Sequence, residues 1–486
     1  MIPKSSVGIV AFGAYVPFGR LQRDAVFAVN GWFNGSLKAL AKGERAIANW
    51  DEDAITMAVE AARDCLGSTE RHDLGAVVLA STTMPFADRQ NSVIVKEALN
   101  LSDDVASVDI TGSQRAGASA MLQALATAGL SGRPVLLAAA EKRKALPGSE
   151  GEMLHGDGAA AFVVGTENIA AELLASHSVA VDFVDHFRGH QREIDYSWEA
   201  RWVRDEGYLK IVPPAVSSAL SSAGLSAADV DSFIFPITAS GIGAALAKQC
   251  GIRPEAVCDP LGDRLGETGA AHALVMLAHV VGSAKPGTRI VTVGFGSGCD
   301  VLVFQVRDAI ASLPARRGVA GWLARRRAES NYMKFLVHGG HLRMDRGMRA
   351  EFDQKQPLTA LYRNRRTVLA LVGGRCTRTG TIQFPQTDIS VNPQSHLVGT
   401  QEDYPLADIQ ARILTFTADN LTYTPDPPAY YGMVEFEGGG RMNAEFCDVS
   451  AQDMEVGRPM RMMFRIKSVD EQRAFIKYFW KAAPAH

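Results

Sequence analysis

Three short segments of the chain carry the side chains that are candidates for catalysis. They are Asp109-Ile-Thr-Gly-Ser-Gln-Arg-Ala-Gly117 with Gln114, Gly266-Glu-Thr-Gly-Ala270 with Glu267, and Gly296-Ser-Gly298 followed by Cys299. A carboxyl group in a half-buried pocket has its charged form disfavoured, which raises its pKa toward the range useful for proton transfer. We therefore predict that Glu267 is an acid/base. The alternative is a helix N-terminal acid that faces solvent or pairs with Arg264.

Other polar side chains in these segments each allow more than one interpretation. Cys299 could line the same pocket, or be a buried and inert thiol. The Gln114 amide could hydrogen-bond a substrate or fill space. We expect His155 and His272 each to be a satisfied core histidine or one that supports a neighbouring site residue, and Asp157, between two glycines, to form a turn.

Two similar halves supply the elements that must position these segments. Residues 54–65 have helical spacing of apolar residues and precede a buried strand at 74–80; the same order recurs in a helix at 212–222 and a strand at 232–236. Strand, loop and strand then follow in both halves, at 133–164 and 288–305. Continuous Val/Ile/Leu runs indicate sheets covered on both faces. The sequence thus predicts an internal duplication of an α/β unit.

Composition narrows the classes of protein. With 486 residues, we expect two to four compact units. A net charge of −3 gives no reason to expect nucleic-acid binding. Six scattered cysteines without a CxxC pair suit a reducing cytoplasm, and we expect no signal peptide and no membrane-spanning helix.

The pattern changes near residue 309. From about 350 onward short strands dominate, with a hairpin at 433–446, an alternating segment at 458–466 and, we expect, a final amphipathic helix at 470–481. Several short strands and a terminal helix favour a small closed barrel such as an OB fold.

Residues 1 to about 308 resemble the thiolase superfamily, in its hydroxymethylglutaryl-CoA synthase and ketoacyl synthase III branch. The motifs that carry the resemblance are residues 43–57, 109–120, 156–160, 266–270 and 294–298. It implies an α/β fold with a five-layered α-β-α-β-α sandwich. Residues from about 330 resemble a zinc-ribbon/OB-fold accessory domain, through 373–385 and 415–419. We expect four parts: two thiolase-like halves (1–165 and 166–308), a linker with a helical segment (309–349), and an all-β OB-fold domain (350–486).

The chain departs from this family at the residues expected to be catalytic. Gln114 takes the place of the nucleophilic cysteine, and an amide cannot hold an acyl group as a thioester. Ile237 stands for the histidine, Glu267 for the asparagine, and the acid/base glutamate falls near Met84. In the accessory domain the zinc pattern survives only as Cys376, with Thr379 and Ile389 in the places of partners. One thiolate cannot hold a structural zinc, so we expect no metal.

The resemblance still implies a way to polarise a thioester. Superfamily members hold its oxygen with two backbone N–H groups, which here would come from Gln114 and from the loop of Gly296 and Gly298. Such an oxyanion hole would stabilise an acyl-CoA enolate, and aldol or retro-aldol chemistry then needs one acid/base and no cysteine. Arg115 would either pair with Asp88 or face a coenzyme A phosphate.

Three functions remain open from the sequence. The first is an acyl-CoA aldolase or lyase, the second a related decarboxylase or acyltransferase, and the third a non-catalytic acyl-CoA-binding scaffold. A coenzyme A thioester is the expected substrate, with no tightly bound cofactor. The arginines of 309–330 are either a solvated linker or surface helix, or a rim that attracts the nucleotide phosphates. By resemblance we expect a homodimer through the sheet edge of the first half.

Overall fold

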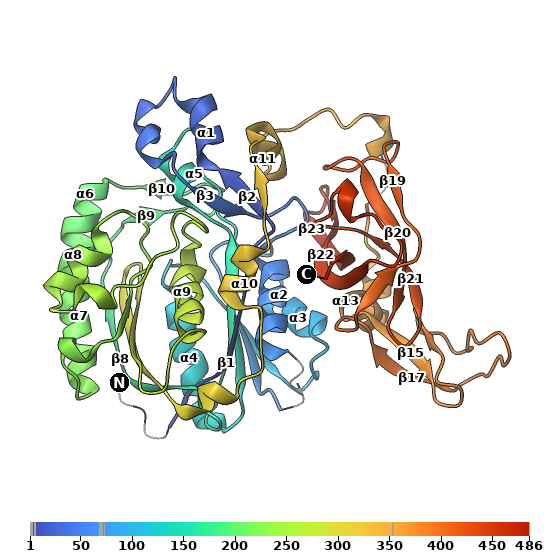
Figure 1. Cartoon of the computed structure of the whole chain (residues 1–486), viewed down its shortest axis with the longest axis horizontal. Coiled ribbons are helices and arrows are strands. Elements are labelled where there is room, and N and C mark those ends of the chain that lie inside the picture. The colour runs from blue at the N-terminus through green and yellow to red at the C-terminus, as the bar shows by residue number, and fades with distance from the viewer. Residues whose placement is uncertain (1–2, 4–5, 68–70, 72, 352–353, 486) are drawn as a thin grey trace. The chain divides into compact units, whose positions relative to one another are not determined.

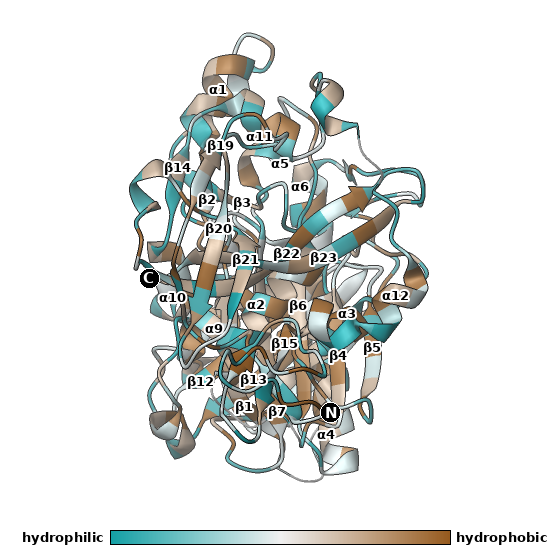
Figure 2. Ribbon diagram, turned by 90° about the vertical axis from the view of Figure 1, so that its right-hand side faces the viewer, coloured by the Kyte–Doolittle hydropathy of each residue, from teal (hydrophilic) through white to brown (hydrophobic). Residues whose placement is uncertain are grey.

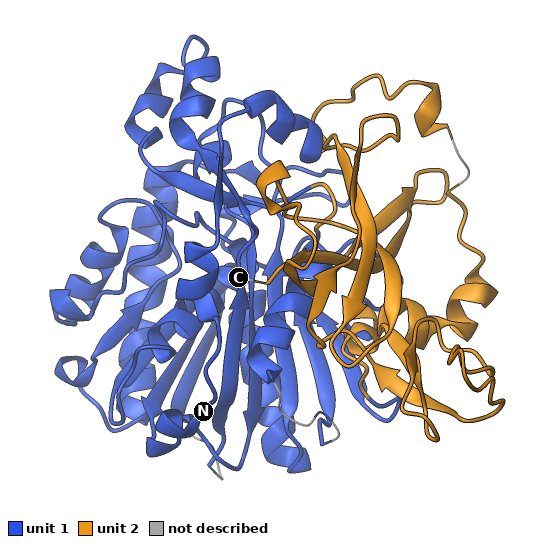
Figure 3. Ribbon diagram, turned by 45° about the vertical axis from the view of Figure 1, so that its right-hand side comes forward, with its two compact units in different colours: residues 1–49, 53–93, 102–339 blue, residues 50–52, 94–101, 340–486 orange. Residues whose placement is uncertain are grey.

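The computed structural model describes residue 3 and residues 6–67, 71, 73–351 and 354–485. The chain divides into two compact units, coloured separately in Figure 3. Unit 1 comprises residues 1–49, 53–93 and 102–339; unit 2 comprises residues 50–52, 94–101 and 340–486. Each unit is considered by itself.

Unit 1 is built on a nine-stranded sheet in the order β11-β12-β13-β8-β1-β7-β6-β4-β5. Most of its strands are apolar runs buried along their length, as the sequence predicts. The exceptions are the edge strand β5 and part of β8. The strands are β1 (Gly8–Tyr15), β4 (Ala76–Ala80), β5 (Ala106–Ile110), β6 (Val135–Glu141), β7 (Gly158–Gly165), β8 (Ala171–Ala180), β11 (Ser232–Ile234), β12 (Arg289–Phe295) and β13 (Gly298–Val306).

The sheet consists of two halves with the same strand order, which confirms the predicted duplication. The first half runs β5-β4-β6-β7-β1, and the second runs β11-β12-β13-β8, extended by a single bridge between Phe233 and Val257 where the first half has β5. In both halves the first long pair is parallel (β4 with β6, β11 with β12) and the next pair is antiparallel. The halves join through two residue pairs of β1 and β8.

Helices complete five layers. α4 (Ala116–Ser131) and α9 (His272–Val281) contact strands of both halves, so they form the shared central layer. α2 (Ala54–Leu66) packs on β1, β7 and β6, and α7 (Leu209–Ser222), next to α8 (Ile242–Gln249), packs on β8 and β13. Figure 1 shows α7 and α8 on one outer side, α4 and α9 in the middle and α2 on the other. The α-β-α-β-α sandwich is therefore confirmed.

Smaller elements of unit 1 surround this sandwich. β14 (Arg327–Glu329), β2 (Gly19–Gln22) and β3 (Glu44–Ile47) form a three-stranded sheet, and β9 (His186–Phe187) pairs with β10 (Tyr196–Ser197). The remaining helices with described positions in unit 1 are α1 (Arg23–Asn30), α5 (Glu150–Leu154), α6 (Ala200–Trp202), α10 (Gly318–Ala324) and α11 (Tyr332–His338).

The arginines of residues 309–330 are bound to unit 1 rather than free in solvent. Arg316 donates to the carbonyl oxygen of Phe12 and lies over its ring, at 4.4 Å from the centroid. Arg325 is 8% exposed and lies over Phe18. The expectation of a solvated linker is therefore wrong at these positions, because aromatic faces and backbone carbonyls hold the guanidinium groups.

Unit 2 contains an antiparallel sheet of β18 to β23 and a smaller sheet of β15, β16 and β17. Hydrophilic and hydrophobic segments alternate along β22 and β23 (Figure 2). The strands and helices are β15 (Val372–Cys376), β16 (Ile382–Gln383), β17 (Gln401–Pro405), β18 (Ala411–Ile413), β19 (Thr417–Asp419), β20 (Ala429–Phe436), β21 (Arg441–Glu445), β22 (Pro459–Asp470), β23 (Phe475–Pro484), α12 (Leu358–Arg363) and α13 (Arg365–Leu369). α3 (Asn91–Ala98) has residues in both units.

The predicted hairpin at 433–446 is present as β20 and β21, but the predicted terminal helix is wrong. Residues 475–484 form β23, which pairs with β22 from Met460 opposite Pro484 to Asp470 opposite Phe475. The segment Phe475-Ile-Lys-Tyr-Phe-Trp480 is rich in aromatic and β-branched residues, which favour a strand. Cross-strand packing such as the stacked Phe464 and Tyr478 rings, 5.4 Å apart, outweighs the helical spacing.

A buried charged cluster lies within unit 2. Arg465, 0% exposed, bonds Glu52 and Asp448 at 3.0 Å each, and Lys481 bonds Asp51 at 2.9 Å. All five side chains are at most 3% exposed. Buried charges persist only when they are paired and hydrogen-bonded, so this cluster ties residues 50–52 to β22 and β23.

In the described part of the chain, no helix combines the length and hydrophobicity required to cross a membrane. The six cysteines are free thiols. Cys376 Sγ lies 3.2 Å from Thr400 Oγ1.

Candidate active site

The turn between β5 and α4 presents Gln114, half-buried, two residues before the start of the central helix. Its Nε2 donates to Thr82 Oγ1 over 3.4 Å, whereas its buried Oε1 has no hydrogen-bond partner among the described residues. The sequence places the family's acid/base position near Met84. In the structure, Thr82 and not Met84 lies beside Gln114. The Met84 sulfur instead accepts from Asn91 Nδ2 at 3.5 Å.

The predicted glycine loop lies against this turn. Ser113 Oγ donates to the Gly296 carbonyl oxygen at 2.9 Å, and a Cβ on Gly296 would sit 3.1 Å from the Gln114 nitrogen. With a φ of +148° and this contact, position 296 accepts only glycine. The sequence prediction that these two segments meet is therefore correct.

One of the expected backbone donors is already engaged in this arrangement. The Gly296 N–H donates to the Gly298 carbonyl at 2.9 Å. For the Gln114 N–H, the described residues offer no hydrogen-bond acceptor. Because an oxyanion needs an unengaged donor, the Gln114 N–H is better placed than that of Gly296.

Glu141, a carboxylate that was not predicted from the sequence, connects the segments that form the site. Glu141, at the end of β6, is fully buried and accepts hydrogen bonds from Ser81 Oγ (3.0 Å), Thr82 N (2.9 Å), Thr83 Oγ1 (2.7 Å) and Ala270 N (3.0 Å). These bonds hold the loop that touches Gln114 and the turn that carries Glu267. The sequence does contain a signal for Glu141, namely an acidic residue at the end of a buried strand, where a side chain can contact the loops at the edge of the sheet.

Arg143, two residues after Glu141, connects the site to Asp195, which lies 52 residues later in the sequence. Its Nη2 lies 2.8 Å from Asp195 Oδ2 and its Nη1 lies 3.3 Å from Glu267 Oε1. The Arg143 and Asp195 side chains are each 4% exposed. A Cβ on Gly269 would meet Gln114 Oε1 at 2.6 Å and Arg143 Cδ at 2.8 Å, so Arg143 fills the space beside Gln114.

Glu267 is fixed by its backbone and by Arg143, and not by Arg264. Its N–H donates to the Leu154 carbonyl and its carbonyl accepts from Gly156, while Arg264 pairs with Asp259 at 2.6 Å. The carboxyl is 23% exposed. Burial raises the pKa of Glu267, and Arg143 opposes that shift. A carboxyl of this kind can exchange a proton with a bound substrate.

Ionisable neighbours extend this centre. Glu267 and Asp185 add to the effect of burial in raising the pKa of Tyr208, whose ring lies 4.8 Å from that of Phe295. Burial together with Arg143 lowers the pKa of His155 well below its usual value, and its Nδ1 has no hydrogen-bond partner. Of the two roles expected for His155, the structure favours a histidine that supports a neighbouring site residue, because it forms a backbone bridge with Glu267.

Two other predicted residues lie outside the site. Cys299 is 0% exposed in the apolar core of the second half, 4.0 Å from the Ile211 carbonyl, and burial raises the pKa of its thiol to about 12. Side chains alternate along a strand, so the residue after the glycine loop faces away from the site. Asp88 is exposed, and Arg115 instead donates to the Val179 carbonyl at 2.7 Å and lies 3.9 Å from Asp300. The predicted Arg115–Asp88 pair is wrong.

The remaining predicted residues have structural roles. His272 is buried, bonded to Thr268 and to the Pro260 carbonyl, and burial lowers its pKa to about 4. Asp157 accepts from the Ala48 N–H at 2.7 Å. Ile237 packs against the core of the second half. The described residues contain no group of three or more His, Cys, Asp or Glu placed to hold a metal ion.

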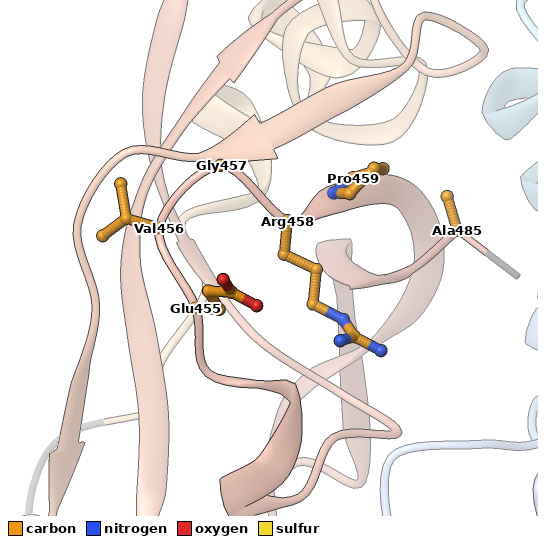
Figure 4. A pocket seen from close by; sticks show the side chains of 6 residues that line it. All are labelled: Glu455, Val456, Gly457, Arg458, Pro459 and Ala485. Carbon is orange, nitrogen blue, oxygen red and sulfur yellow. The ribbon is translucent and has the colours of Figure 1, made fainter.

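A cavity of about 430 Å³ lies in unit 2, none of the residues above lines it, and its lining is drawn in Figure 4. It is bounded by Glu455, Val456, Gly457, Arg458, Pro459 and Ala485. Arg458 already pairs with Asp453 at 2.7 Å. The cavity therefore presents a single carboxylate and a neutralised guanidinium, which gives no reason to place the chemistry there.

Comparisons with known proteins agree with both parts of the fold. Residues 220–306 match the family model described as 3-oxoacyl-[acyl-carrier-protein] synthase III C terminal. Residues 404–465 match the one described as ChsH2, C-terminal OB-fold domain. Among solved structures, a hydroxymethylglutaryl-CoA synthase complexed with CoA has a TM-score of 0.58 at 18% identity, covering 72% of this chain and 95% of that one. The 3-oxoacyl-(acyl carrier protein) synthase III of Pseudomonas aeruginosa has a TM-score of 0.56 at 22% identity, covering 62% and 98%.

Relatives found by sequence have a higher identity to this chain than these two solved structures have. The hydroxymethylglutaryl-CoA synthase of Aeropyrum pernix is 32% identical over 348 residues, which cover 70% of this chain and 96% of that protein. That of Pyrococcus horikoshii is 30% identical over 316 residues, covering 63% and 89%. By sequence and by fold, this chain belongs to the hydroxymethylglutaryl-CoA synthase family.

Proposed function

We propose that the protein is an acyl-CoA-dependent enzyme of carbon–carbon bond chemistry that works without an acyl-enzyme cysteine, most simply as an aldolase acting in the retro-aldol direction. The relatives named hydroxymethylglutaryl-CoA synthase, and a structural neighbour complexed with CoA, support a coenzyme A thioester as substrate. The observation that carries the reaction type is Glu267: a partly exposed carboxyl of raised pKa, held beside the Gln114 turn.

The proposed step uses groups of this chain only. The Glu267 carboxylate takes the proton of the substrate's β-hydroxyl group, and the bond between the α and β carbons breaks. An aldehyde or ketone leaves, and the electron pair moves into the thioester as an enolate whose oxygen accepts from the Gln114 N–H. The α carbon then takes the proton back from Glu267, which restores the carboxylate and releases the shortened acyl-CoA.

The test is incubation of the purified protein with a panel of β-hydroxyacyl-CoA thioesters, with carbonyl products trapped and identified by mass spectrometry. Glu267→Gln should lower turnover by about 10²- to 10⁴-fold, the usual contribution of a general base. Asp259→Asn, which alters an exposed pair with Arg264 on the same segment, is the matched control and should keep full activity. Intact thioesters under all conditions would overturn the proposal.

One observation favours a second candidate, a non-catalytic acyl-CoA-binding scaffold. Arg143 fills the space beside Gln114 and is closed in by Asp195, both side chains being 4% exposed. A substrate must displace or bypass this pair. Under this candidate, coenzyme A thioesters bind, as isothermal titration calorimetry would measure, and remain chemically unchanged.

We also propose a homodimer through the edge of the first half. β5 pairs with β4 on one side only, and Val108 on this edge is 45% exposed. An unpaired strand edge with an apolar side chain is suited to pairing with a second copy across a two-fold axis. Light scattering of the full chain should give the mass of a dimer, and Val108→Lys should shift it toward the monomer.

A further inference from the structure

A short hairpin of unit 1 has two unlike faces. β9 and β10 pair His186 with Ser197 and Phe187 with Tyr196. Phe187, Tyr196 and Trp198 are 56%, 57% and 54% exposed. On the same hairpin, Asp195 is 4% exposed and faces the site, where Arg188 lies 2.7 Å from it. The hairpin, residues 186–197, therefore turns Arg188 and Asp195 inward and the rings of Phe187 and Tyr196 outward.

The hairpin is tied to the segments that surround Gln114. Asp195 bonds Arg143, Arg188 donates to the Thr82 carbonyl oxygen, and Ile194 forms a backbone bridge with Lys144. A second ion pair, Lys144 with Glu193, is 2.7 Å long but 31% and 76% exposed. Exposed pairs contribute little, whereas breaking a buried pair is costly, so the Arg143–Asp195 pair is the one that holds the hairpin closed.

Arg143 is shared between the hairpin and the acid/base. One guanidinium edge bonds Asp195, and Nη1 faces Glu267 at 3.3 Å. Burial alone would lower the pKa of Arg143, but the charges of Glu267 and Asp195 outweigh it and raise that pKa, so the guanidinium stays charged. Asp195 thus holds a second negative charge beside Arg143, and this charge opposes ionisation of Glu267.

We propose that Arg143 is a positioning residue that couples closure of the 186–197 hairpin over the site to the charge state of Glu267. The role of Glu267 in catalysis rests on the proposed function, whereas the coupling between the hairpin and the charge of Glu267 does not. With the hairpin closed, the negative charge of Asp195 lies beside Arg143 and opposes the ionised form of Glu267. With the hairpin open, Arg143 faces Glu267 without that second carboxylate, and the ionised form is favoured.

Other charges around Glu267 bear on this coupling and are part of its test. Asp185 acts to raise the pKa of Glu267 and His186 acts to lower it, and both belong to the hairpin or its entry. Tyr208 and His155 also face this centre, as their own shifted pKa values indicate. Opening the hairpin would move Asp185 and His186 together, and their effects on Glu267 oppose each other. Among the charges, Arg143 has the largest effect on Glu267.

The first measurement is hydrogen exchange of residues 186–197 in the full chain without ligand. Arg143→Met and Asp195→Asn should each speed exchange there about 10-fold, because each removes one partner of a buried pair. Glu193→Gln, which removes the exposed pair on the same hairpin, should change it less than about twofold. Equal exchange in all four proteins would overturn the proposal.

The second measurement is the ionisation of Glu267, followed by carbon NMR of labelled glutamate with Glu267→Gln to assign the signal. Arg143→Met should raise the pKa of Glu267 and Asp195→Asn should lower it, by about one unit each. Shifts in the same direction would contradict the coupling. Should Arg143→Met not fold, Asp195→Asn still tests both readouts. A wild-type protein that cleaves no thioester yet passes these tests refutes only the proposed function.

Discussion

Two buried charged clusters in this protein make different use of the same kinds of side chain. In unit 2, Arg465 and Lys481 are surrounded by Asp51, Glu52 and Asp448, and none of these side chains is more than 3% exposed. In unit 1, Arg143 is equally enclosed, but one of its partners, Glu267, is 23% exposed. Lys481 also pairs with Glu445, whose side chain is 40% exposed. Against the effect of burial, Lys481 and Lys467 lower the pKa of Glu445, whereas burial raises the pKa of Glu267.

These clusters show which buried charges are available for chemistry. A fully enclosed ion pair can only hold chain segments together, because no substrate reaches it. A carboxyl at the margin of a cluster meets solvent or a ligand, but it can exchange protons near neutral pH only where its pKa is raised. A raised pKa at a partly exposed carboxyl, which Glu267 has and Glu445 lacks, therefore separates the candidate site from the structural cluster.

The largest expected effect tests the structural role of the unit 2 cluster. Arg465→Met leaves Glu52 and Asp448 buried without their cation, and should lower the free energy of unfolding of unit 2 by about 3–5 kcal/mol. Hydrogen exchange of β22 and β23 in increasing urea measures it. Arg412→Met, which breaks an ion pair whose arginine is 61% exposed, is the control and should cost less than about 1 kcal/mol. Equal costs would mean that enclosure does not distinguish the two.

A second prediction tests how tightly the unit 1 cluster is packed. Gly269 has a φ of +47°, and a Cβ there would meet Gln114 Oε1 at 2.6 Å and Arg143 Cδ at 2.8 Å. Gly269→Ala should therefore destabilise the chain by about 2 kcal/mol more than Gly132→Ala, because the latter pays only for backbone strain. Gly132 has a φ of +68° and open space around it. Thermal unfolding of both variants compares them, and similar midpoints would indicate a loose site.

The third prediction concerns pH. Retro-aldol cleavage needs ionised Glu267, and burial raises its pKa above the ordinary value of 4.5. The rate should fall about tenfold per pH unit below that raised pKa. The same shift means that the stabilising contribution of protonated Glu267 is lost as pH rises through its folded-state pKa. A profile of kcat/KM against pH measures the midpoint; one at or below 4.5 would contradict the assignment of Glu267.

The smallest expected effect concerns Gln114. Its Oε1 is buried without a partner, which costs free energy, so Gln114→Met should raise the free energy of unfolding by up to about 1 kcal/mol. Activity should change little, since the proposed donor is the backbone N–H. Calorimetry and turnover of the same preparation measure both. A loss of activity comparable to that of Glu267→Gln would instead assign the side-chain amide to the substrate.

The sequence predicted those features that depend on local pattern. Buried runs such as 133–140 became strands, the helix at 54–65 became α2, and the glycine loop at 296–298 met Gln114. The prediction from sequence failed where the conformation depends on packing against another segment. Residues 470–481 have helical spacing, yet pairing with β22 makes the end of that segment a strand. Cys299 follows a site loop, yet strand alternation turns it into the core.

The duplicated α/β architecture and the glutamine at position 114 could be read from the sequence alone, because periodicity and residue identity are properties of the chain. Only the tertiary structure decided that Arg143 and Asp195, 52 positions apart, close the site together, and that Glu267 pairs with Arg143 rather than Arg264. The physical reason is that ion pairing depends on distance and burial in space. Those quantities are set once strands and loops far apart in sequence have packed.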